Sequence, residues 1–467
     1  MRDGWKTLAR LVCTGAAALG LTAPAHAADM SAFVLLGDGG APIARVITSD
    51  ARCPSLTIDG RRLAMRPRAA PATLPLRPTL STPENSKPSA FLVSVCEAAI
   101  PRHTRRASVE GRRLALPPAL IKRIVVIGDT GCRLKASDHA YQDCNDPRAY
   151  PFATVAARAA AWKPDLVIHV GDYLYRENPC PTDHPGCDGS PWGYGWDAWQ
   201  ADFFRPGAPL LKAAPWVLVR GNHENCARAG QGWWRMIDPW PLQARRDCID
   251  AANDTEGDFS PPYAVKLGGG AQVVVLDLAI AGSKPTPDGD PRVAEFRGAY
   301  GALDRFSRRA RFTFMATHKP ILGFGANEKD GKVELFGGTP GIGSVFAAQN
   351  PDLLPAGVDV LLAGHIHLWE QVSFSSSHPS QFIAGFSGTQ EDIVPLPAKL
   401  PPGVTPAAGA VVDHFSSWID GFGYMTLQRL GPQTWAVTVW NLAGKPVNHC
   451  RIEGRRSSCD KPQVTSQ

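Results

Sequence analysis

Short runs of apolar residues, bounded by glycine, proline or charged residues, recur along the chain after residue 120. Such runs are typical of strands that are buried on both faces of a sheet, because neither face then calls for polar side chains. Between two of them, an alanine-rich stretch over 153–162 predicts a helix that stops at Lys163-Pro164. The alternation predicts an α/β fold. The six strand-like runs are Ile124–Ile127, Leu166–Val170, Trp216–Val219, Val273–Leu276, Phe312–Met315 and Val358–Leu362.

Residues 28–120 have a different pattern, with short alternating stretches, many prolines and no long amphipathic helix. Within them, residues 59–65 (DGRRLAM) are echoed by residues 110–116 (EGRRLAL). An acidic residue followed by glycine between apolar stretches predicts a hairpin turn. We therefore expect a small β-rich N-terminal domain, the alternative being a disordered proline-rich linker. A second domain is expected over residues 121–467, with late strands and a C-terminal tail held by Cys450 and Cys459.

The first 27 residues are typical of a cleavable secretory signal. Three basic residues precede a short apolar stretch over 11–21, and Ala25-His26-Ala27 provides a small-x-small cleavage site. The alternative is a buried first helix of the mature fold. The order of basic, apolar and small residues favours a signal peptide, so we expect a periplasmic or secreted protein.

The cysteines agree with export. One of the 11, Cys13, lies in the predicted signal, and the other ten form sequential neighbours. No Cys-x-x-Cys motif is present, which disfavours zinc ribbons and thioredoxin-like sites. Disulfides formed in an oxidising compartment fit best, although the sequence alone leaves their connectivity open. The neighbouring cysteines are Cys53 and Cys96, Cys132 and Cys144, Cys180 and Cys187, Cys226 and Cys248, and Cys450 and Cys459.

Composition excludes several classes of protein. Hydrophobic residues make up 44% of the 467 residues and charged residues 20%, which is typical of a globular protein. A net charge of +6, without a dense basic block interleaved with aromatics, gives no reason to expect nucleic-acid binding. No apolar run reaches the ~18 residues that a membrane-spanning helix requires. The oligomeric state stays open.

Residues that bind hard or borderline metal ions follow five of the six apolar runs. Because ligands collect at the carboxyl ends of strands in open α/β sheets, we expect these side chains to converge on one site. Asp172 can bridge two metals, since a carboxylate has two oxygens, and two adjacent metals suit displacement at phosphorus. In chain order the candidates are Asp129, then Asp172 and Tyr175, then Asn222 and His223, then His318, and finally His365 and His367.

This ordered set resembles the calcineurin-like metallophosphoesterase superfamily, and within it the purple acid phosphatase branch. The first motif, Gly-Asp-x-Gly at 128–131, lacks the histidine that many members place two residues after the aspartate. The second, Gly-Asp-x-x-Tyr at 171–175, offers a tyrosine in its place. The resemblance covers roughly residues 121–400 and implies a β-sandwich flanked by helices, often preceded by a small β domain.

The resemblance also implies a role for each candidate residue. Two metal ions are expected as cofactors: Fe(III), favoured by a phenolate ligand, and a divalent ion such as Fe, Zn or Mn. A metal-bound hydroxide would attack phosphorus in line, and His223 would contact the substrate phosphate as the catalytic side chain. The implied ligands are Asp129, Asp172, Tyr175 and His367 for the first metal, and Asp172, Asn222, His318 and His365 for the second.

The resulting hypothesis is an exported dinuclear hydrolase of small phosphate monoesters. A phosphodiesterase or nucleotidase with the same metal centre is the alternative. A non-catalytic phosphate- or partner-binding module is a third possibility, disfavoured because a binder has no need for every ligand plus His223. The cysteine- and tryptophan-rich segment 178–199 is predicted to be a packed, disulfide-stapled loop that could overhang the site and shape specificity, and His169 is expected to be a core histidine.

Overall fold

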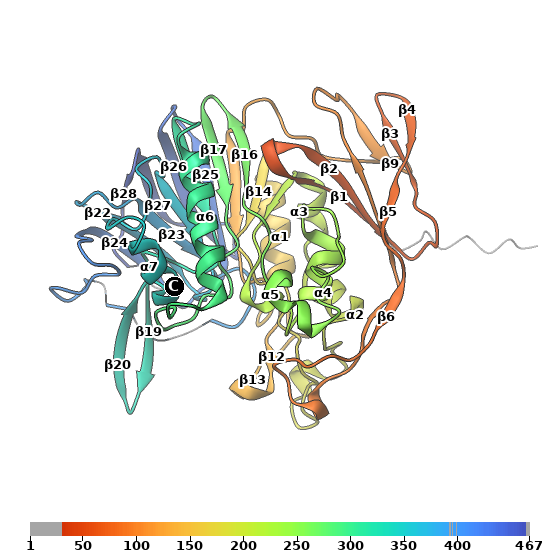
Figure 1. Ribbon diagram of the computed structural model, residues 1–467, viewed down its shortest axis with the longest axis horizontal. Coiled ribbons are helices and arrows are strands. Elements are labelled where there is room, and N and C mark those ends of the chain that lie inside the picture. The colour runs from red at the N-terminus through yellow and green to blue at the C-terminus, as the bar shows by residue number, and fades with distance from the viewer. Residues whose placement is uncertain (1–29, 392–393, 395, 398, 464–467) are drawn as a thin grey trace, which may run out of the picture.

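Two large β-sheets pack face to face, with helices against their outer faces, in the computed structural model of the protein (Figure 1). The structure describes residues 30–391, 394, 396–397 and 399–463. The predicted signal over residues 1–27 lies outside the described residues. The expected mixed α/β fold with an all-β N-terminal region is confirmed.

The larger sheet has 11 strands and combines the N-terminal, middle and C-terminal parts of the chain. Its centre is parallel, because β11 pairs with β14, β14 with β15 and β15 with β1 in the same direction. In spatial order the strands are β28 (Arg456–Cys459), β27 (Pro446–Glu453), β26 (Thr434–Asn441), β25 (Gly423–Arg429), β11 (Arg123–Ile127), β14 (Leu166–His169), β15 (Trp216–Leu218), β1 (Met30–Leu36), β2 (Pro42–Thr48), β8 (Ser94–Ala99) and β5 (Arg66–Ala69).

The second sheet has seven strands, with a parallel centre formed by β17, β18, β21 and β23. Each of the six apolar runs overlaps a strand of one of these two sheets, so that prediction is confirmed. In spatial order the strands are β16 (Tyr263–Gly268), β17 (Ala271–Val275), β18 (Phe312–Ala316), β21 (Val360–Ala363), β23 (Ser380–Ala384), β22 (Trp369–Phe374) and β24 (Val412–Trp418).

Side-chain alternation along each central strand builds the layers. In β11, Ile124 and Val126 point into the core between the sheets, whereas Val125 and Ile127 pack on the opposite face with α1 (Phe152–Ala161). Each run is apolar at every position because both faces of its strand are buried.

Helices cover the outer faces of both sheets (Figure 1). The predicted helix over 153–162 is present as α1, and α6 begins where Asp290 accepts a capping hydrogen bond from the backbone of Arg292. The α-helices are α1 (Phe152–Ala161), α2 (Trp196–Trp199), α3 (Ala208–Ala213), α4 (Gly230–Gly232), α5 (Asp254–Gly257), α6 (Pro291–Ser307) and α7 (Pro340–Ala347). Short π-helical turns span Gln200–Phe204 and Trp233–Ile237, and 3-10 turns span Asp38–Gly40, Pro83–Asn85, Ala136–Asp138, Pro185–Cys187, Asn222–Glu224 and Ala251–Asn253.

The internal repeat folds as two adjacent hairpins. Strands β3 (Ser55–Ile58) and β4 (Arg61–Ala64) form one, and β9 (Ala107–Val109) and β10 (Arg112–Arg113) form the other. Both predicted turns have two residues with positive φ, Asp59 and Gly60 in the first and Glu110 and Gly111 in the second. The hairpins join through β3 and β9 into one four-stranded sheet.

The remainder of the N-terminal region continues the larger sheet through β1, β2, β8 and β5. These strands share a hydrophobic core with the rest of the molecule, so Val34 packs in the same cluster as Ile124. Division of the chain into domains at residue 120 therefore stays a prediction. Three short strand pairs complete the fold: β6 (Ala72–Leu74) with β7 (Ser89–Phe91), β12 (Leu134–Lys135) with β13 (Ala140–Tyr141), and β19 (Phe324–Lys329) with β20 (Lys332–Gly337).

All ten cysteines after the predicted signal are paired in sequential order. The disulfides join Cys53 to Cys96, Cys132 to Cys144, Cys180 to Cys187, Cys226 to Cys248, and Cys450 to Cys459. Five disulfides fit a protein of an oxidising compartment. Among the described residues, no helix combines the length and the apolar character needed to cross a membrane.

Candidate metal centre

The candidate ligands lie in loops that follow the parallel strands of both sheets. Three of them, Asp129, Asp172 and His365, have φ angles of 55°, 58° and 74°. Few residues other than glycine adopt this left-handed region, and such strain is concentrated at functional sites. The loops after β11 and β14 are tied together, because the backbone N–H of Asp129 donates to the carbonyl of Gly171 at 3.0 Å.

Glycines allow these loops to approach one another. A Cβ atom on Gly171, whose φ is +106°, would lie 2.5 Å from Nδ1 of His318. A Cβ atom on Gly221 would lie 2.0 Å from Oδ1 of Asp172. Both positions require glycine because the ligand side chains occupy the space that any larger residue would need.

The hydroxyl of Tyr175 is surrounded by acceptors. It lies 2.9 Å from Oδ1 of Asp129, from Oδ2 of Asp172 and from Nε2 of His367. Nδ1 of His367 lies 2.8 Å from the carbonyl of Gln390 and donates to it, so in the neutral ring Nε2 presents a lone pair. A phenol has one proton and cannot satisfy three acceptors, so this arrangement suits a cation at the same point.

A second group of acceptors converges on His318. Its Nδ1 lies 2.9 Å from the carbonyl of Val170 and donates to it, so that in the neutral ring the lone pair of Nε2 faces the site. That atom lies 3.1 Å from Oδ2 of Asp172 and 3.1 Å from Oδ1 of Asn222. Ligand atoms of Asp172, His318 and His365 all lie within 4.8 Å of one another. Neighbouring lone pairs repel unless a cation lies between them.

The structure thus brings all seven candidate ligands together, with Asp172 shared between the two groups. One group contains Asp129, Tyr175 and His367, and the other contains Asn222, His318 and His365. Nitrogen and oxygen donors of these types suit iron, zinc or manganese. The assignment of each side chain as a ligand stays a prediction.

His223 lies beside this cluster and is held by Glu177 and Arg228. Its Nδ1 lies 3.0 Å from Oε1 of Glu177, and its Nε2 lies 3.8 Å from Oδ2 of Asp172. Burial and the adjacent charge of Arg228 lower the pKa of His223 to about 4. The imidazole is therefore neutral near neutral pH in the protein without metals.

Glu224 joins two ligand loops from within the protein. Its buried carboxylate accepts hydrogen bonds from the backbone N–H groups of Asp172 at 3.1 Å, Tyr173 at 2.9 Å and Gly221 at 3.1 Å. A longer one of 3.3 Å comes from Leu174. Four donors from two loops meet on one side chain, so Glu224 fixes the position of the Asp172 loop relative to the Asn222 turn.

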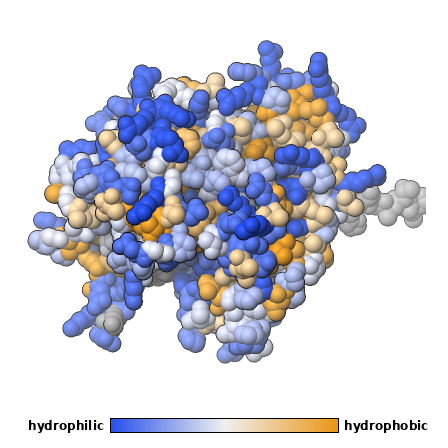
Figure 2. All heavy atoms as spheres, in the orientation of Figure 1, coloured by the Kyte–Doolittle hydropathy of each residue, from blue (hydrophilic) through white to orange (hydrophobic). Residues whose placement is uncertain are grey.

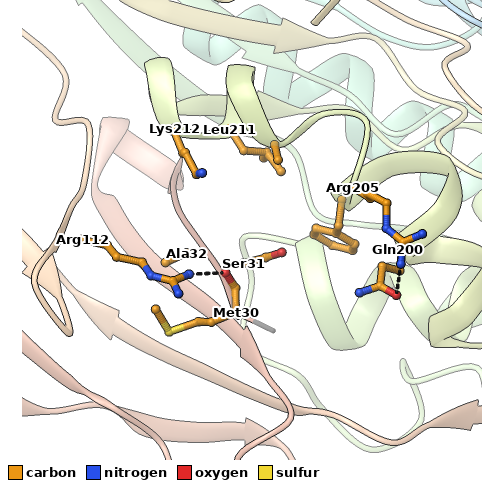
Figure 3. A pocket seen from close by; sticks show the side chains of 10 residues that line it. Met30, Ser31, Ala32, Arg112, Gln200, Arg205, Leu211 and Lys212 are labelled. Atoms are coloured by element: carbon orange, nitrogen blue, oxygen red, sulfur yellow. Dashed lines mark hydrogen bonds between the residues drawn. The ribbon is translucent and has the colours of Figure 1, made fainter. Parts of the chain in front are cut away.

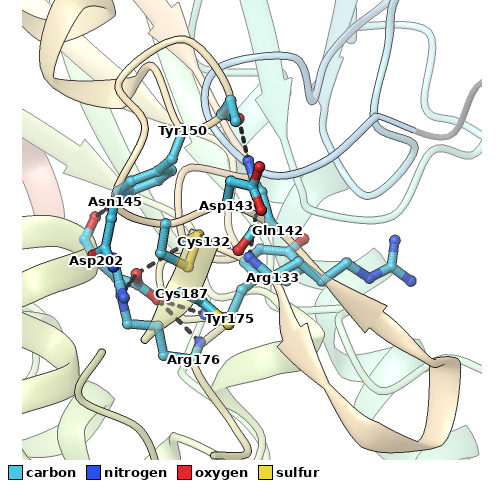
Figure 4. Close-up of a disulfide and its surroundings, with 12 residues drawn as sticks. Cys132, Arg133, Gln142, Asp143, Asn145, Tyr150, Tyr175, Arg176, Cys187 and Asp202 are labelled. Carbon is cyan, nitrogen blue, oxygen red and sulfur yellow. Dashed lines mark hydrogen bonds and ion pairs between the residues drawn. A yellow bond between two sulfur atoms is a disulfide. The ribbon is translucent and has the colours of Figure 1, made fainter. Parts of the chain in front are cut away.

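Asp202 performs the same task for the Tyr175 loop. Its carboxylate accepts from the backbone N–H groups of Cys132 at 3.0 Å and Tyr175 at 2.8 Å, and from Nε of Arg176 at 2.6 Å. Figure 4 shows these groups around the Cys132–Cys144 disulfide, with Arg133 extending away from it. The disulfide loop and the Tyr175 loop are therefore one hydrogen-bonded unit.

Sequence reasoning missed Glu177, Asp202 and Arg228 and gave Glu224 no role. The sequence could have indicated Glu224, because it directly follows the candidate residues Asn222 and His223 in the same turn. The other residues carry no local signal, since their partners belong to distant parts of the chain.

The segment 178–199 forms a loop closed by the Cys180–Cys187 disulfide, as predicted, and the structure does not support an overhang of the cavity. No residue of this segment, all of which the structure describes, lines the cavity next to the ligands. Tyr194 instead donates a 3.0 Å hydrogen bond to Oε2 of Glu177. His169 is buried, and its ring nitrogens contact Thr130 at 2.9 Å and the backbone N–H of Gly171 at 3.2 Å, as expected for a core histidine.

A cavity of about 580 Å³ opens directly onto the candidate ligands. Asp172, Asn222, His365 and His367 contribute to its floor together with His223 and Arg228. Arg133 and Lys135 also line the cavity, as does the hairpin β19–β20 through Asn327, Glu328 and Phe336. Figure 2 shows mainly hydrophilic side chains over this hairpin, where it projects from the body of the molecule. The cavity has room for a small organic phosphate.

A separate cavity of about 300 Å³ lies between β1 and α3 (Figure 3). Arg112, Arg205 and Lys212 line it, and Arg112 donates a 2.9 Å hydrogen bond to the carbonyl of Met30. None of the candidate ligands contributes to this cavity.

The chain is similar to known proteins in part of its sequence and in its fold. The sequence model of the calcineurin-like phosphoesterase family matches residues 122–368. Among solved structures, a purple acid phosphatase, PPD1, from yellow lupin (Lupinus luteus) seeds is similar with a TM-score of 0.51 and 11% identity over 93% of this chain and 74% of that one. PhoD is similar with a TM-score of 0.49 and 12% identity over 94% of this chain and 92% of that one. No curated protein sequence matches significantly.

Proposed function

Because the chain belongs to the calcineurin-like phosphoesterase family and is a metal-dependent phosphoesterase, we propose that it is an exported hydrolase of small phosphate monoesters. The observation that carries this proposal is the convergence of lone pairs at two neighbouring points, the hydroxyl of Tyr175 and Nε2 of His318. Asp172 belongs to both groups, as a bridging carboxylate of a dinuclear metal centre would.

We assign Asp129, Asp172, Tyr175 and His367 to the first metal, and Asp172, Asn222, His318 and His365 to the second. A phenolate oxygen at Tyr175 favours Fe(III) for the first metal, with divalent Fe, Zn or Mn in the second. Held by these residues, two such ions would lower the pKa of a water molecule and neutralise charge on the phosphoryl oxygens.

The residues of the chain position the substrate. His223 lies beside Asp172 at the floor of the cavity, where its ring can contact a phosphoryl oxygen or the leaving oxygen. Glu224 and Asp202 hold the ligand loops in place through backbone hydrogen bonds. As in other phosphoryl transfers, the protein contributes mainly position and charge stabilisation.

Export is supported by two independent features. Five disulfides join all ten cysteines that follow residue 27, and such bonds persist in oxidising compartments. The basic, apolar and small-residue pattern of residues 1–27 is that of a signal peptide.

Hydrolysis of an aryl phosphate monoester beside its bis-aryl diester tests the proposal. Purified protein should prefer the monoester from acid to neutral pH and lose activity with a chelator. Preference for the diester would instead favour a phosphodiesterase with the same metal centre. Metal binding without hydrolysis of either ester would favour a phosphate-binding module.

A further inference from the structure

Arg228 is a buried cation at the edge of the metal centre. Its side chain is 4% exposed, yet it lines the 580 Å³ cavity together with Asp172, Asn222 and His223. Burying a guanidinium is costly unless it is paired and hydrogen-bonded. Glu177 provides the pairing, because its carboxylate accepts from Nε of Arg228 at 2.9 Å and from Nη2.

This ion pair fixes the direction of the guanidinium. Glu177 is itself held by Tyr194, whose hydroxyl donates to Oε2 at 3.0 Å. The two-pronged contact uses the Nε and Nη2 edge of Arg228, and Nη2 also lies 2.7 Å from Nε2 of His223. A guanidinium held in this way presents its remaining donors in one direction, without the entropy loss of ordering a free side chain.

The remaining donor group is Nη1. It carries two N–H groups, and the partner that the structure shows for it is the carbonyl of Asn222, at 3.5 Å. That contact is at the limit of a hydrogen bond and can use only one of the two N–H groups. At least one donor of Arg228 is therefore available next to the floor of the cavity.

We propose that Arg228 is a substrate-binding residue, whose Nη1 group donates to a non-bridging phosphoryl oxygen and thereby selects phosphate monoesters over diesters. This inference rests on the proposed function and deepens it. A monoester presents three non-bridging oxygens and two negative charges, whereas a diester presents two such oxygens and one charge. The third anionic oxygen of the monoester is the acceptor that Arg228 recognises.

Discrimination follows from the cost of an unmatched donor. In a diester the third oxygen carries a carbon substituent, which makes it a poorer acceptor and fills the space beside the guanidinium. A site that is built to hydrogen-bond one group rejects analogues that lack it, because its buried polar atoms are then left without a partner. The preorganised donor also stabilises charge on the phosphoryl oxygens in the transition state.

The test compares kcat/KM for an aryl phosphate monoester and its bis-aryl diester in the metal-loaded enzyme and in the variants Arg228→Gln and Arg228→Lys. Removing one such donor should lower monoester hydrolysis by about 10²–10³-fold. Diester hydrolysis should fall by less than about tenfold, so that the monoester-to-diester ratio drops at least tenfold. The lysine variant keeps the charge and should retain part of the preference.

Lys212→Gln serves as the matched control, because it removes a cation that lines the other cavity. It should leave both rates unchanged. Inhibition by inorganic phosphate gives a second readout, and we expect weaker inhibition of both Arg228 variants but not of the control. Thermal unfolding shows whether each variant is folded, and Arg228→Lys keeps the test available if Arg228→Gln does not fold.

Equal losses on both esters would overturn the inference, since they would mean that Arg228 only supports Glu177 and His223. Unchanged kinetics in both variants would also overturn it. Failure of the proposed function is visible separately, in the unaltered enzyme. If that enzyme cleaves only diesters, or neither ester, the monoester assignment and the role of Arg228 fail together before any variant is compared.

Discussion

The hydroxyl of Tyr175 lies 2.9 Å from Nε2 of His367, although the two residues are 192 positions apart in the chain. Tyr175 follows a strand of the larger sheet and His367 follows a strand of the second sheet. Loops that follow strands of both sheets therefore contribute side chains to one candidate site.

Tyr175 provides a spectroscopic prediction. If it binds Fe(III), the iron-loaded protein should absorb visible light through phenolate-to-iron charge transfer. Tyr175→Phe should abolish the band, because the ring remains but the donor oxygen is lost. Absorption spectroscopy of matched samples with measured iron content checks this. An active, colourless wild-type protein that contains only divalent metals would refute the iron assignment and leave the phosphoesterase intact.

Metal removal should lower both activity and stability. Without cations, the lone pairs around Tyr175 and His318 face one another, and any ligand that binds only the folded state stabilises it. A chelator should therefore abolish hydrolysis and lower the Tm, and divalent metal should restore both. Asp172→Asn, which weakens both metal groups, should respond less to the chelator. A Tm and a rate that do not change on verified metal loss would contradict the prediction.

His223 and Asn222 should each be essential for hydrolysis. His223→Ala removes a side chain next to Asp172 and should lower kcat by about 10²–10⁴-fold. Asn222→Ala removes a proposed ligand and should also reduce the metal content. Arg308→Gln is the control, because Arg308 is exposed and pairs only with Asp304 among the partners that the structure shows. If neither alanine variant is slower than this control, the proposed mechanism is wrong.

Glu224→Gln should lower the metal affinity of the site although it changes none of the candidate ligands. In glutamine an NH₂ group replaces one carboxylate oxygen. Its N–H bonds would point at backbone N–H groups that donate to that oxygen in the wild type. We expect a loss of roughly 1–3 kcal/mol in the free energy of unfolding and a lower metal affinity. Urea unfolding and metal titration measure the two effects. Glu256→Gln makes the same change at an exposed ion pair with Arg245, and equal behaviour of the two variants would refute the role of Glu224.

Asp359 should make stability fall as the pH rises. Burial raises the pKa of this carboxyl to about 6 in the folded protein, where it accepts a 2.7 Å hydrogen bond from the backbone N–H of Thr313. Between its ordinary pKa of about 4 and 6, the unfolded chain releases the proton first, so ionisation favours unfolding. Relative to Asp359→Asn, the wild type should lose roughly 2–3 kcal/mol of unfolding free energy between pH 4 and pH 7. Parallel stability curves for the two proteins would contradict this.

Much of the fold and of the candidate site was predictable from the sequence because the relevant signals are local. Apolar runs such as Ile124–Ile127 mark strands buried on both faces, and acid–glycine pairs such as Asp59-Gly60 mark turns that require positive φ. Candidate ligands such as Asp129 directly follow such runs, and the carboxyl ends of strands in a sheet share an edge. The same apolar runs therefore predicted both the positions of the strands and the candidate ligands that follow them.

Other features depended on contacts that local patterns do not encode. Nothing in the sequence near Arg228 indicates that its partner is Glu177, or that Tyr194 supports that carboxylate from behind. The pairing of β1 with β15 extends the larger sheet. It depends on which strands of a distant part of the chain lie side by side in the folded protein.

The sequence by itself determined which residue types stand at the ends of the strands, because backbone conformation and burial follow from near neighbours. Only the tertiary structure decided which of these side chains share a cation, which buried charges hold them, and where the segment 178–199 packs. Those outcomes depend on distances between residues far apart in the chain, and such distances are fixed only when the two sheets close on a common core.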